Sequence, residues 1–293
     1  MLKCFDPSVD GRELDRPRFK FHHQLMGHPA LELENLAKVI PSLPEEYVKY
    51  SKGLMRNGED FENCNVLHRS QMPLAETIEC MRTSDSYVMV RSPQIHESFQ
   101  PVFRDLSGDV EQLLRQMFGP RDRRLLIKPQ LYLFIASPGS HTPFHIDRNS
   151  TMLLQFRGSK QVVLFPPWEP RVVTDEAREA YAAYDNTKLP WSEERDAFGQ
   201  RFDFAPGEGL HIPFIAGHYV QNGNDDVSIS MSIIFNTPES HAQLDALQFN
   251  HKVRGMGWAP SPVGHRAGRD QLKSFLWRAR RKVRHTLHLP EES

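Results

Sequence analysis

The 293-residue chain contains only three cysteines, Cys4, Cys64 and Cys80, and their spacing does not match that of a zinc site. An odd number of scattered cysteines argues against a disulfide scaffold and favours reduced thiols. No run approaches the ~20 apolar residues of a membrane helix, and the first residues lack the apolar segment of a signal peptide. These absences predict a soluble, cytoplasmic protein without a membrane span.

The chain also has little net charge, −1 in total, but the charge is unevenly distributed. From Lys252 to the end the net charge is +7, and the preceding residues carry −8. Residues 268–287 are basic and carry apolar residues at helical spacing: Leu272, Phe275, Leu276, Ala279, Val283 and Leu287. We expect a helix that packs on the body of the chain or forms a homodimer interface. Nucleic-acid binding through this tail is the less favoured alternative, because no helix-turn-helix pattern accompanies it.

Hydrophobic periodicity divides the chain into three regions, 1–120, 121–240 and 241–293. The first is predicted to be mostly helical, with helices near 28–40, 73–81 and 99–118 and a short strand at 87–91. In the second, short β-type segments alternate with turn residues: 131–135, 152–156, 161–165, 209–213 and 227–235. An insertion at 175–195 is predicted to be a helix and loop, and Trp168 and Trp191 are candidates for a lid. Many short strands in series predict an antiparallel barrel or sandwich flanked by helices.

The strand-rich region contains a candidate metal site. His145 and Asp147 are two residues apart, and His218 follows 71 positions after Asp147. Alternate residues of a strand point to one face, so a His-x-Asp pair can direct both side chains at one ion. Two imidazoles and one carboxylate are typical of a non-haem Fe(II) site, in which further coordination positions stay open for a cosubstrate and dioxygen.

Lys160 lies thirteen residues after Asp147, at the start of a predicted strand. A lysine that points into a barrel beside a metal needs an anionic partner, and a dicarboxylate such as 2-oxoglutarate would supply one. Thr142 could donate its hydroxyl to the same carboxylate, and Tyr132 and Ser232 are further candidates for the cosubstrate pocket. An exposed lysine at a strand end is the alternative interpretation.

Three segments, 142–147, 154–167 and 206–218, resemble the JmjC-type branch of the cupin superfamily, which are iron- and 2-oxoglutarate-dependent oxygenases. The resemblance covers about residues 125–237, and within that branch this part of the chain is similar to the asparaginyl hydroxylases. It implies a double-stranded β-helix, metal ligation by His145, Asp147 and His218, and cosubstrate binding by Lys160 and Thr142. Ala216-Gly217 replaces a bulky aromatic pair of those hydroxylases. The whole chain also resembles bacterial cupin-like proteins often labelled transcriptional regulators.

The sequence thus predicts an Fe(II)- and 2-oxoglutarate-dependent oxygenase that uses dioxygen to hydroxylate a C–H bond of a peptide side chain or a small molecule. One alternative is a cupin isomerase or dioxygenase that does not use 2-oxoglutarate. A second is a ligand sensor that acts as a transcriptional regulator without oxygenase activity. The role of Lys160 discriminates the 2-oxoglutarate-dependent oxygenase from the first alternative, and salt-dependent DNA binding through residues 264–285 would favour the second.

Overall fold

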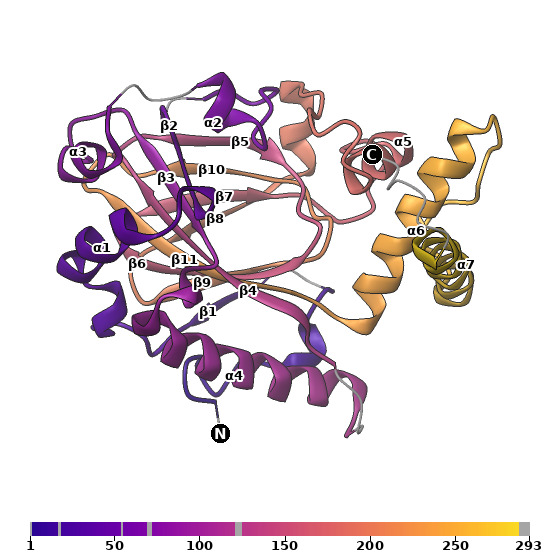
Figure 1. The fold of residues 1–293 in the computed structure, drawn as a ribbon, viewed down its shortest axis with the longest axis horizontal. Helices are drawn as coiled ribbons and strands as arrows, with labels where there is room; N and C mark the ends of the chain where they lie inside the picture. Colours follow the sequence, from indigo (N-terminus) through magenta and orange to yellow (C-terminus); the bar gives the residue numbers. More distant parts are fainter. Residues whose placement is uncertain (1, 17–18, 54, 69–71, 121–124, 287–293) are drawn as a thin grey trace.

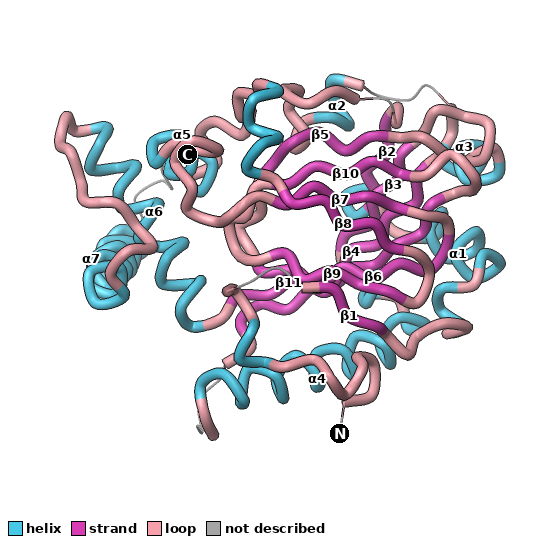
Figure 2. Tube along the Cα trace, turned by 180° about the vertical axis from the view of Figure 1, so that it is seen from behind, coloured by secondary structure: helices cyan, strands magenta, loops and turns pink. Residues whose placement is uncertain are grey.

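Two antiparallel β-sheets face each other in the computed structural model, which describes residues 2–16, 19–53, 55–68, 72–120 and 125–286 (Figures 1 and 2). The large sheet has the order β1-β9-β6-β11-β4-β3-β2 and the small sheet the order β5-β10-β7-β8. This arrangement is the jelly roll with flanking helices that the sequence predicts, so the predicted fold class is confirmed.

The strands are short, and most connect through tight turns. Those of the large sheet are β1 (Lys20–His22), β2 (Val48–Ser51), β3 (Tyr87–Arg91), β4 (Ile127–Ala136), β6 (Ser150–Arg157), β9 (Glu208–Ile212) and β11 (Ser228–Asn236). Those of the small sheet are β5 (His141–His145), β7 (Lys160–Leu164), β8 (Gln200–Phe204) and β10 (His218–Asn222). Gly158 has a φ of +66° in the turn between β6 and β7, which a glycine adopts without steric cost.

The helices of the described residues lie outside the two sheets. They are α1 (Leu33–Val39), α2 (Cys64–Leu67), α3 (Leu74–Glu79), α4 (Gln100–Phe118), α5 (Asp175–Ala182), α6 (Pro238–Gly255) and α7 (Ala267–Thr286). Helix α4 lies along the outer face of the large sheet, and the α6–α7 hairpin lies at one end of the barrel, beyond α5 (Figure 1). None of these described helices is long and apolar enough to span a membrane.

Alternation along β11 shows how the large sheet separates its core from a cavity. Ile229, Met231 and Ile233 are buried in the hydrophobic cluster that includes the apolar face of α4. Ser232, one residue out of phase, faces the inside of the barrel and lines a cavity between the two sheets. Successive side chains of a strand point to opposite faces, so Ser232 and Ile234 face the cavity and the alternating residues Ile229, Met231 and Ile233 face the core.

The N-terminal region is less separate from the barrel than its helical periodicity predicts. It contributes the described strands β1, β2 and β3 to the large sheet, of which only β3 matches a predicted strand. The predicted helix at 28–40 is divided into a 3₁₀ turn at Pro29–Leu31, α1, and a second turn at Ile40–Ser42. Pro41 explains why α1 does not continue beyond this point, because a proline is not accommodated in the interior of a helix. The earlier break is at Glu32, which has an extended backbone conformation.

The C-terminal helix forms at the predicted position. Its apolar face does not pack on the body of the chain, which was one of the two arrangements expected from the sequence. Leu272, Phe275 and Val283 are 59%, 64% and 57% exposed, so they do not pack on the same chain. Helix α7 instead attaches to α6 through polar contacts: Ser274 donates to Asp245 at 2.8 Å and the Trp277 indole donates to Gln248 at 2.9 Å. Leu287, which the sequence places on the same apolar face, lies outside the described residues.

Candidate metal centre

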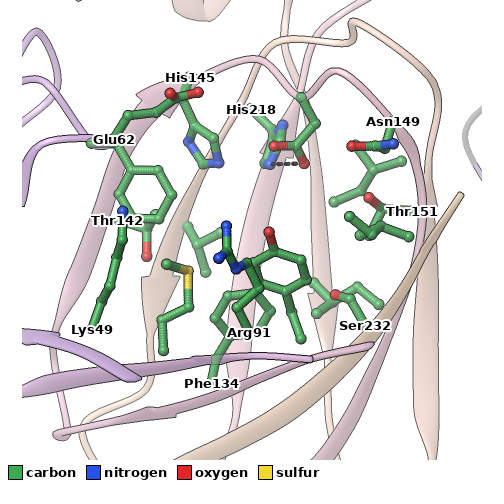
Figure 3. A pocket seen from close by; sticks show the side chains of 18 of the residues that line it. Lys49, Glu62, Arg91, Phe134, Thr142, His145, Asn149, Thr151, His218 and Ser232 are labelled. Carbon is green, nitrogen blue, oxygen red and sulfur yellow. Dashed lines mark ion pairs between the residues drawn. The ribbon is translucent and has the colours of Figure 1, made fainter. Parts of the chain in front are cut away.

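His145, Asp147 and His218 converge at the open end of the cavity, where each can direct a ligand atom at one point. Their ligand atoms all lie within 4.8 Å of one another. His145 ends β5 and His218 begins β10, and these strands are neighbours that pair the two histidines directly. The two imidazole rings are 4.1 Å apart between centroids. Figure 3 shows both rings pointing into the pocket.

Asp147 reaches this point by a different route from the one that strand alternation predicts. Strand β5 ends at His145, so Asp147 lies in the loop that follows and not on the strand. Its backbone carbonyl accepts a hydrogen bond from the Ile215 amide at 3.1 Å, which ties this loop to the segment preceding His218. Its carboxylate is 3.7 Å from Nε2 of His218.

Hydrogen bonds to the backbone fix the orientation of both imidazoles. Nδ1 of His145 donates to the Pro143 carbonyl at 2.7 Å, and Nδ1 of His218 donates to the Ala216 carbonyl at 3.1 Å. Each Nε2 therefore carries its lone pair toward the cavity. Burial lowers the pKa of His145 well below its usual value, and the neighbouring His218 lowers it further, so this ring is neutral and can bind a metal. Burial raises the pKa of Asp147 in the absence of a cation, although His218 opposes the shift.

Lys160 lies in the interior of the barrel, at the start of β7, and lines the same cavity. Its Nζ donates to the hydroxyl of Ser230 at 2.7 Å, and no carboxylate lies within ion-pair distance among the described residues. Burial lowers the pKa of Lys160 to about 7. The alternative of an exposed strand-end lysine is therefore wrong, because the ammonium is buried without a counter-ion.

The other three predicted pocket residues also line this cavity, which has a volume of about 360 Å³. Thr142 is buried on β5, and its hydroxyl acts on the pKa of the buried Tyr87 phenol, which burial raises. Tyr132 on β4 lies directly opposite Ser232 on β11. The cavity thus brings together every residue that the sequence singled out for this site.

Several further cavity residues could not be recognised from the sequence. Tyr87 and Arg91 lie on β3, a strand that the sequence predicts but cannot place beside β4. The loop before α2 contributes Phe61, whose ring lies 4.4 Å from that of His145, and Glu62, which forms an ion pair with Arg148. These contacts join segments far apart in the chain, and no local pattern encodes them.

Two tyrosines of the insertion at 175–195 line the cavity, whereas its tryptophan, Trp191, does not. Tyr181 and Tyr184 line the cavity, and the Arg148 guanidinium lies 4.2 Å and 3.6 Å from their ring centroids. Trp191 packs instead against Phe144 in a hydrophobic cluster behind the small sheet, where Trp168 also packs. The candidate lid is therefore formed by tyrosines, because the tryptophans are occupied in packing.

Comparison with known proteins agrees with this architecture. Residues 34–241 match the cupin-like domain family. The structure resembles that of YcfD, a ribosomal oxygenase from Escherichia coli, in complex with cobalt and 2-oxoglutarate, with a TM-score of 0.51 and 12% sequence identity over 94% of this chain and 67% of that chain. A second structure of the same protein gives a TM-score of 0.48 with 12% identity over 94% and 68% of the two chains.

A third, in complex with cobalt and succinic acid, gives a TM-score of 0.46 with 12% identity over 94% and 67%. At this identity the likeness describes the fold alone. No curated protein sequence matches the chain. The family match nevertheless spans more than half of the residues, and the chain belongs to the cupin-like domain family.

Proposed function

We propose that this protein is an Fe(II)- and 2-oxoglutarate-dependent oxygenase that hydroxylates a C–H bond of its substrate. The observation that carries the proposal is the pairing, in one cavity, of a two-histidine, one-carboxylate cluster with a buried lysine that has no acidic partner among the described residues. The first feature fits a divalent iron with open coordination positions. The second fits the far carboxylate of a dicarboxylic acid.

The protein groups fit these two ligands by their chemistry. His145 and His218 offer Nε2 lone pairs, and Asp147 offers the carboxylate that offsets part of the charge of a divalent cation. A metal would favour the ionised form of Asp147 and so reverse the effect of burial on its pKa. The structural likeness to a ribosomal oxygenase in complex with cobalt and 2-oxoglutarate supports the same pair of ligands.

The chain's contribution to the reaction is binding, orientation and the exclusion of water. Lys160 would pair with the far carboxylate of 2-oxoglutarate, with Thr142 as a hydroxyl donor and Tyr132 and Ser232 on the adjacent walls. The ring of Phe61 packs against the ring of His145, and Tyr181 and Tyr184 line the cavity, Tyr184 being largely exposed. When bound, iron, 2-oxoglutarate and dioxygen together supply the oxidant for the substrate C–H bond.

Calorimetry of the Mn(II)-loaded protein with 2-oxoglutarate tests this proposal without requiring turnover. Wild type should bind 2-oxoglutarate, and Lys160→Ala should bind it about 100-fold or more weakly, because removal of one partner of a buried ion pair costs roughly 3–5 kcal/mol. Lys188→Ala, on the exposed part of the insertion, is the matched control and should bind normally. Absence of binding to wild type would favour a cupin isomerase or a ligand sensor.

A further inference from the structure

Two cations of the cavity wall have no role in the proposed function, and both come from the N-terminal strands of the large sheet. Lys49 lies on β2 and Arg91 at the end of β3, and both line the cavity. Their side chains lie inside the pocket, on walls other than those that carry His145 and His218 (Figure 3). Lys160 is a separate cation, on β7 of the other sheet.

The strand geometry directs Arg91 into the cavity. Val88 and Val90 of β3 are buried in the core, so Tyr87, Met89 and Arg91 alternate to the cavity face. Arg91 pairs in register with Tyr132 on β4, and its charge acts on the phenol of that tyrosine. The strand ends there because Ser92 adopts a left-handed conformation with a φ of +55°.

Neither cation is neutralised by the protein. Among the described residues no carboxylate lies within ion-pair distance of Lys49 or Arg91, and Arg91 has only a distant contact, 5.9 Å, with the ring of Tyr47. None of the described acids that line the cavity forms an ion pair with Lys49 or Arg91. Glu62 is paired with Arg148, and Asp147 belongs to the metal centre. Glu46 is solvent-exposed, as Lys49 and Arg91 themselves are, and it forms no ion pair with either cation.

We propose that the primary substrate carries an anionic group, a carboxylate or a phosphate, which Arg91 binds as the specificity-determining contact and Lys49 supports. This inference rests on the proposed function, because it assigns Lys160 to the cosubstrate and Arg91 to the substrate. A guanidinium offers two parallel N–H donors to a carboxylate or phosphate, a geometry that a lysine cannot reproduce. A cavity of about 360 Å³ is at the lower end of the range for small-molecule sites and would hold 2-oxoglutarate as well, so the anionic group would enter it on a small molecule or on a single side chain.

The assignment of Arg91 to a substrate anion can be tested by the proton NMR relaxation of small probe molecules. The protein is loaded with Mn(II) and saturated with 2-oxoglutarate. The protons of a probe that binds near the paramagnetic Mn(II) then relax faster. The carboxylate arm compares N-acetylglutamate amide with the neutral N-acetylglutamine amide. The phosphate arm compares N-acetylphosphoserine amide with N-acetylserine amide. We expect the anionic member of at least one pair to bind about tenfold or more tightly than its neutral partner, because a hydrogen bond between charged groups is stronger than one to a neutral group by about this factor.

Arg91→Gln should remove this preference, Arg91→Lys should retain part of it, and Lys49→Gln should reduce it less. Arg91→Gln should weaken the binding of 2-oxoglutarate far less than it weakens the binding of the anionic probe, because Lys160, the proposed partner of the cosubstrate, lies on the other sheet, although Arg91 neighbours Tyr132. Arg115→Gln on α4, which removes a guanidinium far from the cavity, is the control for charge alone and should bind all probes normally.

Equal binding of the neutral and anionic probes to wild type, or no binding of either anionic probe, would overturn the proposal. A loss of 2-oxoglutarate affinity in Arg91→Gln as large as the loss of probe affinity would also overturn it, because Arg91 would then belong to the cosubstrate site. A wild-type protein that does not bind 2-oxoglutarate would refute the proposed function instead. In that case the same probes, added to the protein with Mn(II) alone, still report whether Arg91 selects an anion.

Discussion

Lys160 is the residue on which the proposed binding of 2-oxoglutarate depends most. Its burial without a carboxylate partner costs free energy in the free protein, and a bound dicarboxylate would offset that cost. Ser230 gives its ammonium one hydrogen-bond acceptor, which does not replace a counter-charge. A pKa of about 7 in the free protein means that this lysine is only partly charged near neutral pH.

The affinity for 2-oxoglutarate should therefore depend on pH. Below pH 7 the Lys160 ammonium is charged before the ligand binds, and the affinity should change little. Above pH 7 the free amine is mostly neutral and must take up a proton on binding, so the affinity should fall by up to about tenfold per pH unit. Calorimetry of the Mn(II)-loaded protein in buffers of different ionisation enthalpy measures this proton uptake. A constant affinity without proton uptake between about pH 7 and 9 would refute the assignment of this pKa.

At the scale of single residues, much of the candidate site could be predicted from local sequence. The spacing of His145 and Asp147 and the turn before Lys160 are short-range patterns, and strand alternation correctly directs Ser232 inward. The contributions of Tyr87 and Arg91 depend on the pairing of β3 with β4, which brings together residues more than 40 positions apart. Such a pairing leaves no local signal.

At the scale of secondary-structure elements, the sequence predicts only one strand of the small sheet, β7. Strand β10 starts at His218 and β8 at Gln200, and neither has a long apolar run to identify it. Helix α6 was also not predicted, although Thr237 and Ser240 form a reciprocal capping box at its start. Its buried face includes polar residues such as Asp245 and Asn250, which weaken the apolar periodicity.

Helix α7 carries an apolar stripe that is exposed in the described part of the chain. Leu272, Phe275, Leu276 and Val283 follow helical spacing and are all exposed. An exposed stripe of this length is typical of an interface between helices. We therefore retain the prediction that α7 packs against a second copy of the chain.

Phe275→Glu tests this prediction, because a carboxylate in the stripe would have to be desolvated on association. Wild type should sediment as a dimer at micromolar concentration, and Phe275→Glu should sediment as a monomer that still binds Mn(II). Val66→Glu is the control, since Val66 is 72% exposed on α2 and its change should leave the mass unaltered. A monomeric wild type at about 100 μM would contradict the prediction, because specific dimers usually bury enough surface to form well below that concentration.

At the scale of the whole molecule, one buried carboxylate joins the N-terminal segment to α4. Asp109 accepts hydrogen bonds from the backbone amides of Lys3, Cys4 and Phe5, at 2.9, 2.7 and 3.1 Å. The N-terminal segment thereby packs against the helix that covers the outer face of the large sheet (Figure 1). This contact is remote from the metal centre and should affect stability alone.

Asp109→Ala should lower the free energy of unfolding by about 3 kcal/mol, because three backbone donors lose a charged acceptor. Glu111→Ala is the matched control on the same helix, since its exposed ion pair with Arg115 should contribute less than about 1 kcal/mol. Urea denaturation measures both changes. If the two variants lose the same stability, or if Asp109→Ala loses metal binding in the folded state, this account of the N-terminal segment is wrong.

The fold of the whole molecule could be predicted because many short strands with turn signals permit few architectures. The position of the N-terminal strands could not, since β1 pairs with β9 across about 190 residues. Those strands matter for function, because β2 and β3 supply the cationic wall of the cavity. In the proposed function, the residues for the metal and for 2-oxoglutarate come mainly from the barrel, whereas the proposed contact with the substrate comes from the N-terminal region.

The most direct test of the account is the visible charge-transfer absorption that a 2-oxo acid produces when it chelates Fe(II). Under anaerobic conditions, wild type with one equivalent of Fe(II) should develop this band on addition of 2-oxoglutarate. Asp147→Ala and His218→Ala should not develop it, and Lys160→Ala should do so only at about 100-fold higher 2-oxoglutarate. A wild-type protein that shows no band at saturating 2-oxoglutarate, or an Asp147→Ala variant that shows the full band, would contradict the assignment of an iron and 2-oxoglutarate site to this cavity.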